Sequence, residues 1–446
     1  MFDLSSNQAA WITHVVSLHH LSASQRTQLE VDLDNMITAL RPHLSEEEAF
    51  VVATRRLAQS SGFPLALEPQ NTWKLSQTKP KVSSDERSGW IQLLTLVSFI
   101  LIAGTLAKLP SWMITERYTL AYELLQMKNV SLYVLPLGAL LLALRRKLNW
   151  RITVGVLGFY AVAALLINLY PYDGQRMTEV LTGLHLPLLG WLVLGIVYVG
   201  EPWTSTSKRM EFIRFSGEAF IYAVLIFMGV LVLSGFTILI FQSIGVDAST
   251  FVSDYVLVYG SCAVVLLAID QIERGHFLGQ FAPVLARIFS PLFLVALSVF
   301  LLIMVLSGQN PLADRNYLIG FDAMLILVLA LVVYGISARP LMQRWGLSDW
   351  INLALIGGAL FIDLAALWQI LIRLGTMGIT PNKMAALGEN VLVLGNLVGL
   401  GYYLVRIWRH QGSFEHLEHF QTFYLTLYAG WLAIVAFGFP IFFGFM

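Results

Sequence analysis

The chain has 446 residues, of which 57% are hydrophobic and 13% charged, whereas a soluble protein carries about a quarter charged residues. Its 28 basic and 28 acidic residues cancel, so no overall positive field favours nucleic-acid binding. The single cysteine, Cys262, excludes a disulfide within the chain. From Trp90 onward, apolar runs of bilayer-spanning length follow one another, which predicts an all-α membrane bundle.

Residues 1–61 have the pattern of a small cytosolic helical domain. Ser22–Gln25 and Ser45–Glu48 match the capping box, in which a serine oxygen accepts from an early helix N–H group. Apolar residues at helical spacing follow each box, over Leu29–Leu40 and Phe50–Leu57. A weaker helix before them would complete a three-helix domain.

The run Leu44-Ser-Glu-Glu-Glu-Ala-Phe50, followed by Arg55-Arg-Leu57, resembles the permease-prefix (HAAS-like) domain of bacterial membrane proteins. The resemblance implies a regulatory helical domain ahead of a membrane region. The residues themselves leave two roles open, a structural or assembly module and a binding module for a cytosolic protein partner. Prolines and the polar run Ser83–Ser88 then predict a linker over 62–89. The first twenty residues lack a basic start and a long apolar core, so we expect no cleaved signal peptide.

Eleven membrane helices are expected from the length and apolarity of the runs. The second is shorter than the roughly 20 residues that cross a hydrocarbon core. The expected helices cover 90–109, 130–145, 151–170, 178–199, 218–243, 252–270, 284–308, 317–338, 350–374, 385–405 and 422–445.

Basic residues gather in alternate loops of this bundle. The opposite loops after the third, fifth, seventh and ninth helices are poorer in basic residues, with only Arg176, Arg315 and Lys383. Because positive loops stay in the cytoplasm, we expect a cytoplasmic N-terminus and an external Met446 in the inner (plasma) membrane. The basic loops hold Arg145, Arg146, Lys147, Arg151, Lys208, Arg209, Arg214, Arg274, Arg339, Arg344, Arg406 and Arg409.

Several spaced motifs over about 180–410 resemble a family of bacterial multi-pass membrane proteins classed as a domain of unknown function. The family usually has arginine where this chain has Lys383. The resemblance implies a fold and no established activity. The motifs are Leu186-Pro-Leu-Leu-Gly-Trp191, Phe212–Glu218, Ala282–Arg287 with Ser290–Phe293, and Gly378-Ile-Thr-Pro-Asn-Lys383.

Asp363 is the most conspicuous residue of the bundle, because an ionised carboxylate at mid-membrane costs at least about 3 kcal/mol. We expect it to face the bundle interior, to carry its proton or to find a partner. The tenth helix adds Glu389, Asn390 and Asn396 to this predicted intramembrane polar site. Two interpretations stay open, a functional site and a buried polar network that locks the last helices together.

Three further features accompany this site. Asp322 adds an acid near the outer end of the eighth helix, and His185 in the fourth is best interpreted as a satisfied core imidazole. Gly388, Gly395 and Gly399 on the tenth helix allow close packing.

Arg214 and Glu218 lie four residues apart at the cytosolic start of the fifth helix, and Arg287 enters the seventh from the same side. They predict either ion pairs that fix the depth of the bundle or a cytosolic gate.

Thr380, Pro381, Asn382 and Lys383 form a helix start, with threonine at the N-cap and proline at the first position. The alternative interpretation is an anion site at the outer face. The histidines and glutamates of 410–420 lack a third ligand at helical spacing, so we expect no metal.

The chain contains no G-x-x-x-x-G-K-S/T, H-E-x-x-H or G-x-S-x-G pattern, and we expect no cofactor. The residues favour permease-like passage of a small solute or ion. A membrane sensor that signals through residues 1–61 is the alternative, and an enzyme acting on a lipid-linked substrate ranks last. Expected partners are the lipid bilayer, a cytosolic protein and, as an open possibility, further copies of the chain.

Overall fold

Contacts divide the computed structural model into two compact units, Met1–Leu93 and Leu94–Met446. The structure describes residues 4, 7–9, 11, 12, 23–41, 46, 49, 50, 52–54, 86–114, 119–146, 148–172, 176–274, 281–307, 315–339 and 345–446. Within these ranges, side chains are described for all residues except 23–28, 86–88, 281–287, 303–305, 307 and 315–319.

The first unit contains helix α2 (Ala23–Leu40) and a small apolar core. Leu29, Leu33 and Ile37 of α2 are buried in that core, together with Trp11 and Phe50. The helical spacing of the leucines explains why they share this face. Ser22, Ser45 and residues 62–85 of the predicted linker lie outside the described residues. Residues 86–89, predicted as the end of the linker, form the first turn of helix α5 (Glu86–Met113).

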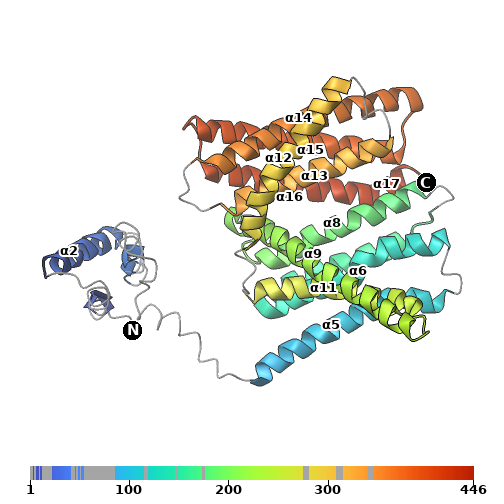
Figure 1. The fold of residues 1–446 in the computed structure, drawn as a ribbon, viewed down its shortest axis with the longest axis horizontal. Helices are drawn as coiled ribbons and strands as arrows, with labels where there is room; N and C mark the ends of the chain where they lie inside the picture. The colour runs from blue at the N-terminus through green and yellow to red at the C-terminus, as the bar shows by residue number, and fades with distance from the viewer. Residues whose placement is uncertain are drawn as a thin grey trace. The chain divides into compact units, whose positions relative to one another are not determined.

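The second unit is a bundle of long helices, and its described residues contain no strand, which confirms the predicted all-α class (Figure 1). Among the described residues, ten helices are long and apolar enough to cross a bilayer. Helix α12 corresponds to the seventh predicted span, 284–308, and its apolar stretch Ile288–Leu302 is described in full. The elements are α5 (Glu86–Met113), α6 (Leu120–Arg146), α7 (Trp150–Leu169), α8 (Met177–Val199), α9 (Thr206–Ser243), α10 (Ser249–Phe251), η1 (Val252–Val256), α11 (Leu257–Glu273), α12 (Phe281–Ser307), α13 (Arg315–Ser337), α14 (Leu347–Met377), α15 (Pro381–Trp408), α16 (Phe414–Ala433), η4 (Ile434–Gly438) and α17 (Phe439–Phe442).

The second membrane helix is longer than its sequence suggests. Helix α6 has 27 residues and begins at Leu120, ten residues before the predicted start. In the sequence, the apolar run begins only after the polar residues Lys128 and Asn129. Both side chains are nevertheless buried, because other helices supply their partners. The connection to α5, expected to be about 20 residues long, therefore spans only residues 114–119.

The bundle has two large hydrophobic cores, which we call the first and the second core. The first is built by α5, α6, α7, α8, α9 and α11, and the second by α9 and α12–α16. Helix α9 contributes Phe212 and Phe215 to the first core and Met210 and Ile213 to the second. In Figure 1 the orange and red helices lie above the blue and cyan ones, and α8 packs against α16 and η4.

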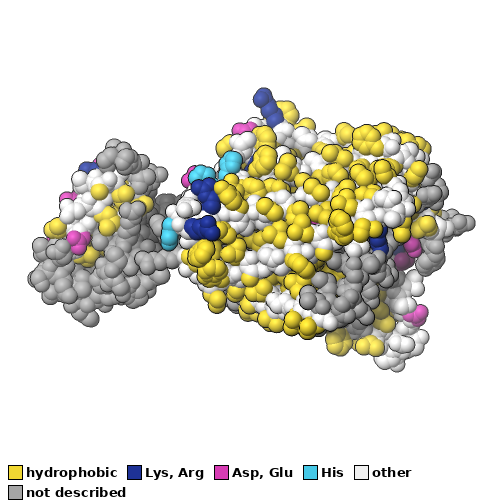
Figure 2. All heavy atoms as spheres, turned by 90° about the horizontal axis from the view of Figure 1, so that it is seen from above, with side chains coloured by type: hydrophobic (Ala, Val, Ile, Leu, Met, Phe, Trp, Pro, Cys, Tyr) yellow, Lys and Arg dark blue, Asp and Glu magenta, His cyan; other side chains and the backbone are white. Residues whose placement is uncertain are grey.

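Hydrophobic side chains cover much of the bundle's outer flank (Figure 2). Leu233, Phe236 and Ile240 of α9 are each more than 60% exposed, as is Trp368 of α14. A protein in water would not expose so much apolar surface, whereas in a bilayer these side chains contact lipid. The chain is therefore an integral, multi-pass membrane protein.

We name the two ends of the bundle after helix α8, as the Met177 end and the Val199 end. Lys, Arg and His side chains gather at the Val199 end, on the left in Figure 2. Several of them are paired there: Arg145 and Arg274 both contact Asp270, and Arg146 contacts Glu273 at 2.6 Å. The pairs of Arg145 and Arg146 fasten α6 to α11.

Candidate functional site

Asp363 lies near the middle of α14, roughly 20 Å from either end at a rise of about 1.5 Å per residue. Its side chain is fully buried and faces the bundle interior. Neither carboxylate oxygen has a hydrogen-bond partner among the described residues. Since buried polar groups are nearly always paired, an unpartnered carboxylate in the core requires an explanation beyond packing.

Asn396 lies at the same depth as Asp363, because α14 and α15 run antiparallel and each residue is close to its helix centre. Asn396 is fully buried, and its Nδ2 donates to Gln421 Oε1 at 3.1 Å. Its Oδ1 and the hydroxyl of Tyr428 on α16 have no partner in the described part of the chain. The charge of Asp363 acts on Tyr428, so α14, α15 and α16 each place an unpaired polar group at a similar depth near mid-membrane.

Asp322 of α13 connects Asp363 with the second half of the site. Asn390 Nδ2 donates to Asp322 Oδ1 at 3.1 Å. The charge of Asp322 acts on Asp363, and that of Glu389 acts on Asp322. The structure therefore joins Asn390 to Asp322 and couples Asp322 electrostatically to Asp363 and Glu389, whereas Asn396 has no described hydrogen bond with the other predicted site residues.

His185 and Glu389 link the two halves of the bundle, since one is on α8 and the other on α15. His185 Nδ1 lies 2.7 Å from the carbonyl oxygen of Leu181, and its Nε2 lies 2.5 Å from Glu389 Oε1. A carbonyl oxygen only accepts, so Nδ1 carries a hydrogen. The Nε2–Oε1 contact then requires one further proton, held either as imidazolium–carboxylate or as neutral imidazole with carboxylic acid.

This shared proton is the part of the site that sequence reasoning missed. The sequence suggested a satisfied core imidazole, and one nitrogen of His185 is indeed satisfied by Leu181 of its own helix. The other nitrogen depends on Glu389, 204 residues further along the chain. No pattern within either helix indicates which residue of the other it will face.

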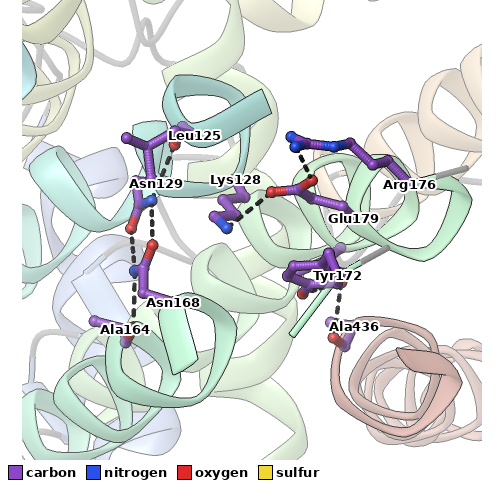
Figure 3. A network of polar contacts seen from close by, with 10 residues as sticks. Leu125, Lys128, Asn129, Ala164, Asn168, Tyr172, Arg176, Glu179 and Ala436 are labelled. Carbon is purple, nitrogen blue, oxygen red and sulfur yellow. Dashed lines mark hydrogen bonds and ion pairs between the residues drawn. The ribbon is translucent and has the colours of Figure 1, made fainter. Parts of the chain in front are cut away.

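A second polar network lies between this pair and the Met177 end (Figure 3). Lys128 Nζ contacts Glu179 Oε1 at 2.8 Å, and both side chains are less than 10% exposed. Arg176 approaches the other oxygen of Glu179 at 3.5 Å, and Lys128 Nζ lies 4.8 Å from the centre of the Tyr172 ring. Burial raises the pKa of Tyr172 to about 12, although a hydrogen bond with Thr182 acts in the opposite direction.

Helix α8 carries polar side chains from this network toward His185. Thr178, Thr182 and His185 are all buried and share one helical face. Thr182 Oγ1 donates to the carbonyl of Ala436 at 3.0 Å, a carbonyl in the π-helical turn η4. Such a turn leaves carbonyls without their usual helical donors, and here a side chain supplies one.

Arg214 and Glu218 form the ion pair that their spacing predicts, with Arg214 Nε 3.1 Å from Glu218 Oε1. Glu218 is buried, whereas about half of the Arg214 side chain is exposed. The side chain of Arg287 lies outside the described residues, so its predicted contact with Glu218 does too.

Pro381 is the first residue of α15, as the sequence predicts. Thr380 occupies the N-cap position, but its hydroxyl makes no capping hydrogen bond. Lys383 Nζ donates to the carbonyls of Gly378 at 2.7 Å and Arg373 at 3.3 Å. The ammonium group therefore caps the end of α14, and neighbouring Asn382 is half-buried beside it.

Comparison with protein-family models, curated proteins and solved structures finds no match to this chain. The two family resemblances of the sequence therefore stay predictions, and the site has to be interpreted from its own chemistry.

Proposed function

We propose that this protein is a proton-coupled permease that moves a small solute or ion between its two groups of helices. The observation that supports this most is Asp363, an acid in the centre of the bundle with neither oxygen partnered by the described residues. An apolar residue would pack there at a lower free-energy cost, so a functional role best explains the carboxyl group.

The task we assign to Asp363 is to bind and release a proton. A neutral acid is tolerated in the core, whereas the ionised form draws a cation, water or a polar solute to the site. Asn396 Oδ1 and the Tyr428 hydroxyl supply polar contacts to such a guest at the same depth.

Protons reach Asp363 in this proposal from Glu389, about a third of whose side chain is exposed. The charge of Asp322 interacts with those of both Glu389 and Asp363. The His185–Glu389 contact joins α8 and α15, one helix from each group, and holds Glu389 in place.

The test is proton flux in vesicles that contain the purified full-length protein and an entrapped pH-sensitive dye. Small solutes of different classes are added outside, and the active solute should cause proton movement in the wild type. Asp363→Asn should abolish that movement while the protein elutes as a folded particle, and Asp247→Asn in an exposed turn should retain it. Wild-type flux in the Asp363→Asn variant would overturn the proposal.

The orientation we propose places the Val199 end in the cytoplasm. Its support is the gathering of arginines there, including Arg145, Arg146, Arg274, Arg406 and Arg409.

A further inference from the structure

The C-terminal end of α15 borders an open groove of about 600 Å³. It lies at the Val199 end of the bundle, about 15 Å along the helix axis from the depth of Asn396. The groove is thus separate from the site around Asp363. Its lining residues are Gly401, Tyr402, Val405, Arg406, Arg409 and Gln411.

Two guanidinium groups line this groove, and none of its described lining residues is acidic. Arg406 is held in place, because its Nη2 donates to the carbonyl of Gln411 at 2.8 Å and its Nη1 to the Tyr402 hydroxyl at 3.3 Å. Arg409 is exposed, and its guanidinium makes no ion pair with any carboxylate of the described residues. The groove therefore presents two positive charges with unused hydrogen-bond donors.

Neighbouring tryptophans indicate the depth of the groove in the membrane. The rings of Trp408 and Trp350 lie 5.3 Å apart, and Trp350 contacts Trp345 at 5.6 Å. Trp408 and Trp350 are each more than 40% exposed. Exposed tryptophans of membrane proteins gather at the headgroup level, so the two arginines lie where lipid phosphates are.

Below the arginines, α15 presents a continuous apolar surface. Val391, Val398 and Tyr402 are each more than half exposed, and their spacing places them on the same helical face as Arg409. This stripe has the position and the length to accompany an acyl chain from the headgroup level into the hydrocarbon.

We propose that this groove binds one anionic phospholipid, with its phosphate between Arg406 and Arg409 and an acyl chain along the stripe. Arginine donates in a planar fork that matches phosphate oxygens, and basic pockets at helix ends recognise anionic headgroups. The proposal does not depend on the permease function, because the groove and the polar site use different residues of α15.

Native mass spectrometry of the full-length protein, extracted from phosphatidylcholine membranes with and without phosphatidylglycerol, tests this assignment. The wild type should retain phosphatidylglycerol in preference to phosphatidylcholine. Arg406→Gln and Arg409→Gln should each weaken that preference about fivefold, since an arginine near an anionic surface contributes about 1 kcal/mol.

The matched control is Arg151→Gln, because Arg151 is an exposed arginine at the same end of the bundle, beside Trp150 and outside the groove. It should leave the preference unchanged, and Arg409→Lys should keep part of it. Equal retention in the wild type and in the Arg406→Gln/Arg409→Gln double variant would overturn the proposal. Displacement of the lipid by an equal concentration of inorganic phosphate would also overturn it, by identifying a site for a soluble anion.

Discussion

Glu389 and His185 meet at 2.5 Å across the boundary between the first and the second core. The contact needs a proton between its nitrogen and oxygen atoms, because the other ring nitrogen of His185 donates to the carbonyl of Leu181. The ion pair of Arg214 with Glu218, in contrast, lies within one helix and joins no two helices.

Glu389→Gln should keep the His185 contact, because its side-chain amide can donate to His185 Nε2. We therefore expect this variant to keep most of the wild-type free energy of unfolding in a denaturant titration. Glu389→Ala should lower the free energy of unfolding by about 1–3 kcal/mol, because His185 Nε2 loses its partner. Equal losses in Glu389→Gln and Glu389→Ala would show that the contact with His185 does not stabilise the bundle.

Lys128 and Glu179 form a buried ion pair, and removal of one partner should leave an uncompensated charge. Lys128→Met and Glu179→Gln should each destabilise the bundle by about 3–5 kcal/mol in a denaturant titration. The double variant should recover much of that loss, since no charge then stays buried without a partner. If the two single effects simply add, the contact is not an energetic pair; Arg176, which also approaches Glu179, would then be the partner to test.

Gly399 has no room for a side chain, because a Cβ atom there would lie 1.9 Å from the ring of Phe420 on α16. Gly399→Ala should therefore force α15 and α16 apart and cost about 1–3 kcal/mol of unfolding free energy. Gly430→Ala on α16 is the matched control, because nothing lies within 4 Å of its Cβ position. It should be neutral or slightly stabilising, since alanine favours helix over glycine. Equal effects of the two substitutions would argue against close packing at Gly399.

The orientation can be tested by cysteine labelling, because Cys262 is only 5% exposed and should give little background. Thr204→Cys lies at the Val199 end and Val246→Cys at the Met177 end, and both positions are exposed. A membrane-impermeant maleimide added to intact cells should label Val246→Cys, and should label Thr204→Cys only after lysis. The reverse pattern would invert the proposed topology.

Most of the helices could be predicted from sequence, because whether a segment can span the membrane depends on its own length and composition. The start of α6 could not, since Lys128 and Asn129 are compatible with a membrane helix only through partners on α8 and α7. The same limit applies to the site. Asp363 stands out as an acid inside an apolar run, whereas the pairing of His185 with Glu389 depends on how α8 packs against α15, which the periodicity of a single helix does not encode.

The central claim is that Asp363 exchanges a proton, and difference infrared spectroscopy of the reconstituted protein tests it without knowledge of the substrate. A pH step should change a carboxylic-acid C=O band in the wild type, and Asp363→Asn should lack that band. Asp322→Asn should retain it, which separates the two neighbouring acids. A spectrum in which Asp363→Asn matches the wild type would mean that Asp363 stays sealed in one protonation state, and the proposed coupling would be wrong.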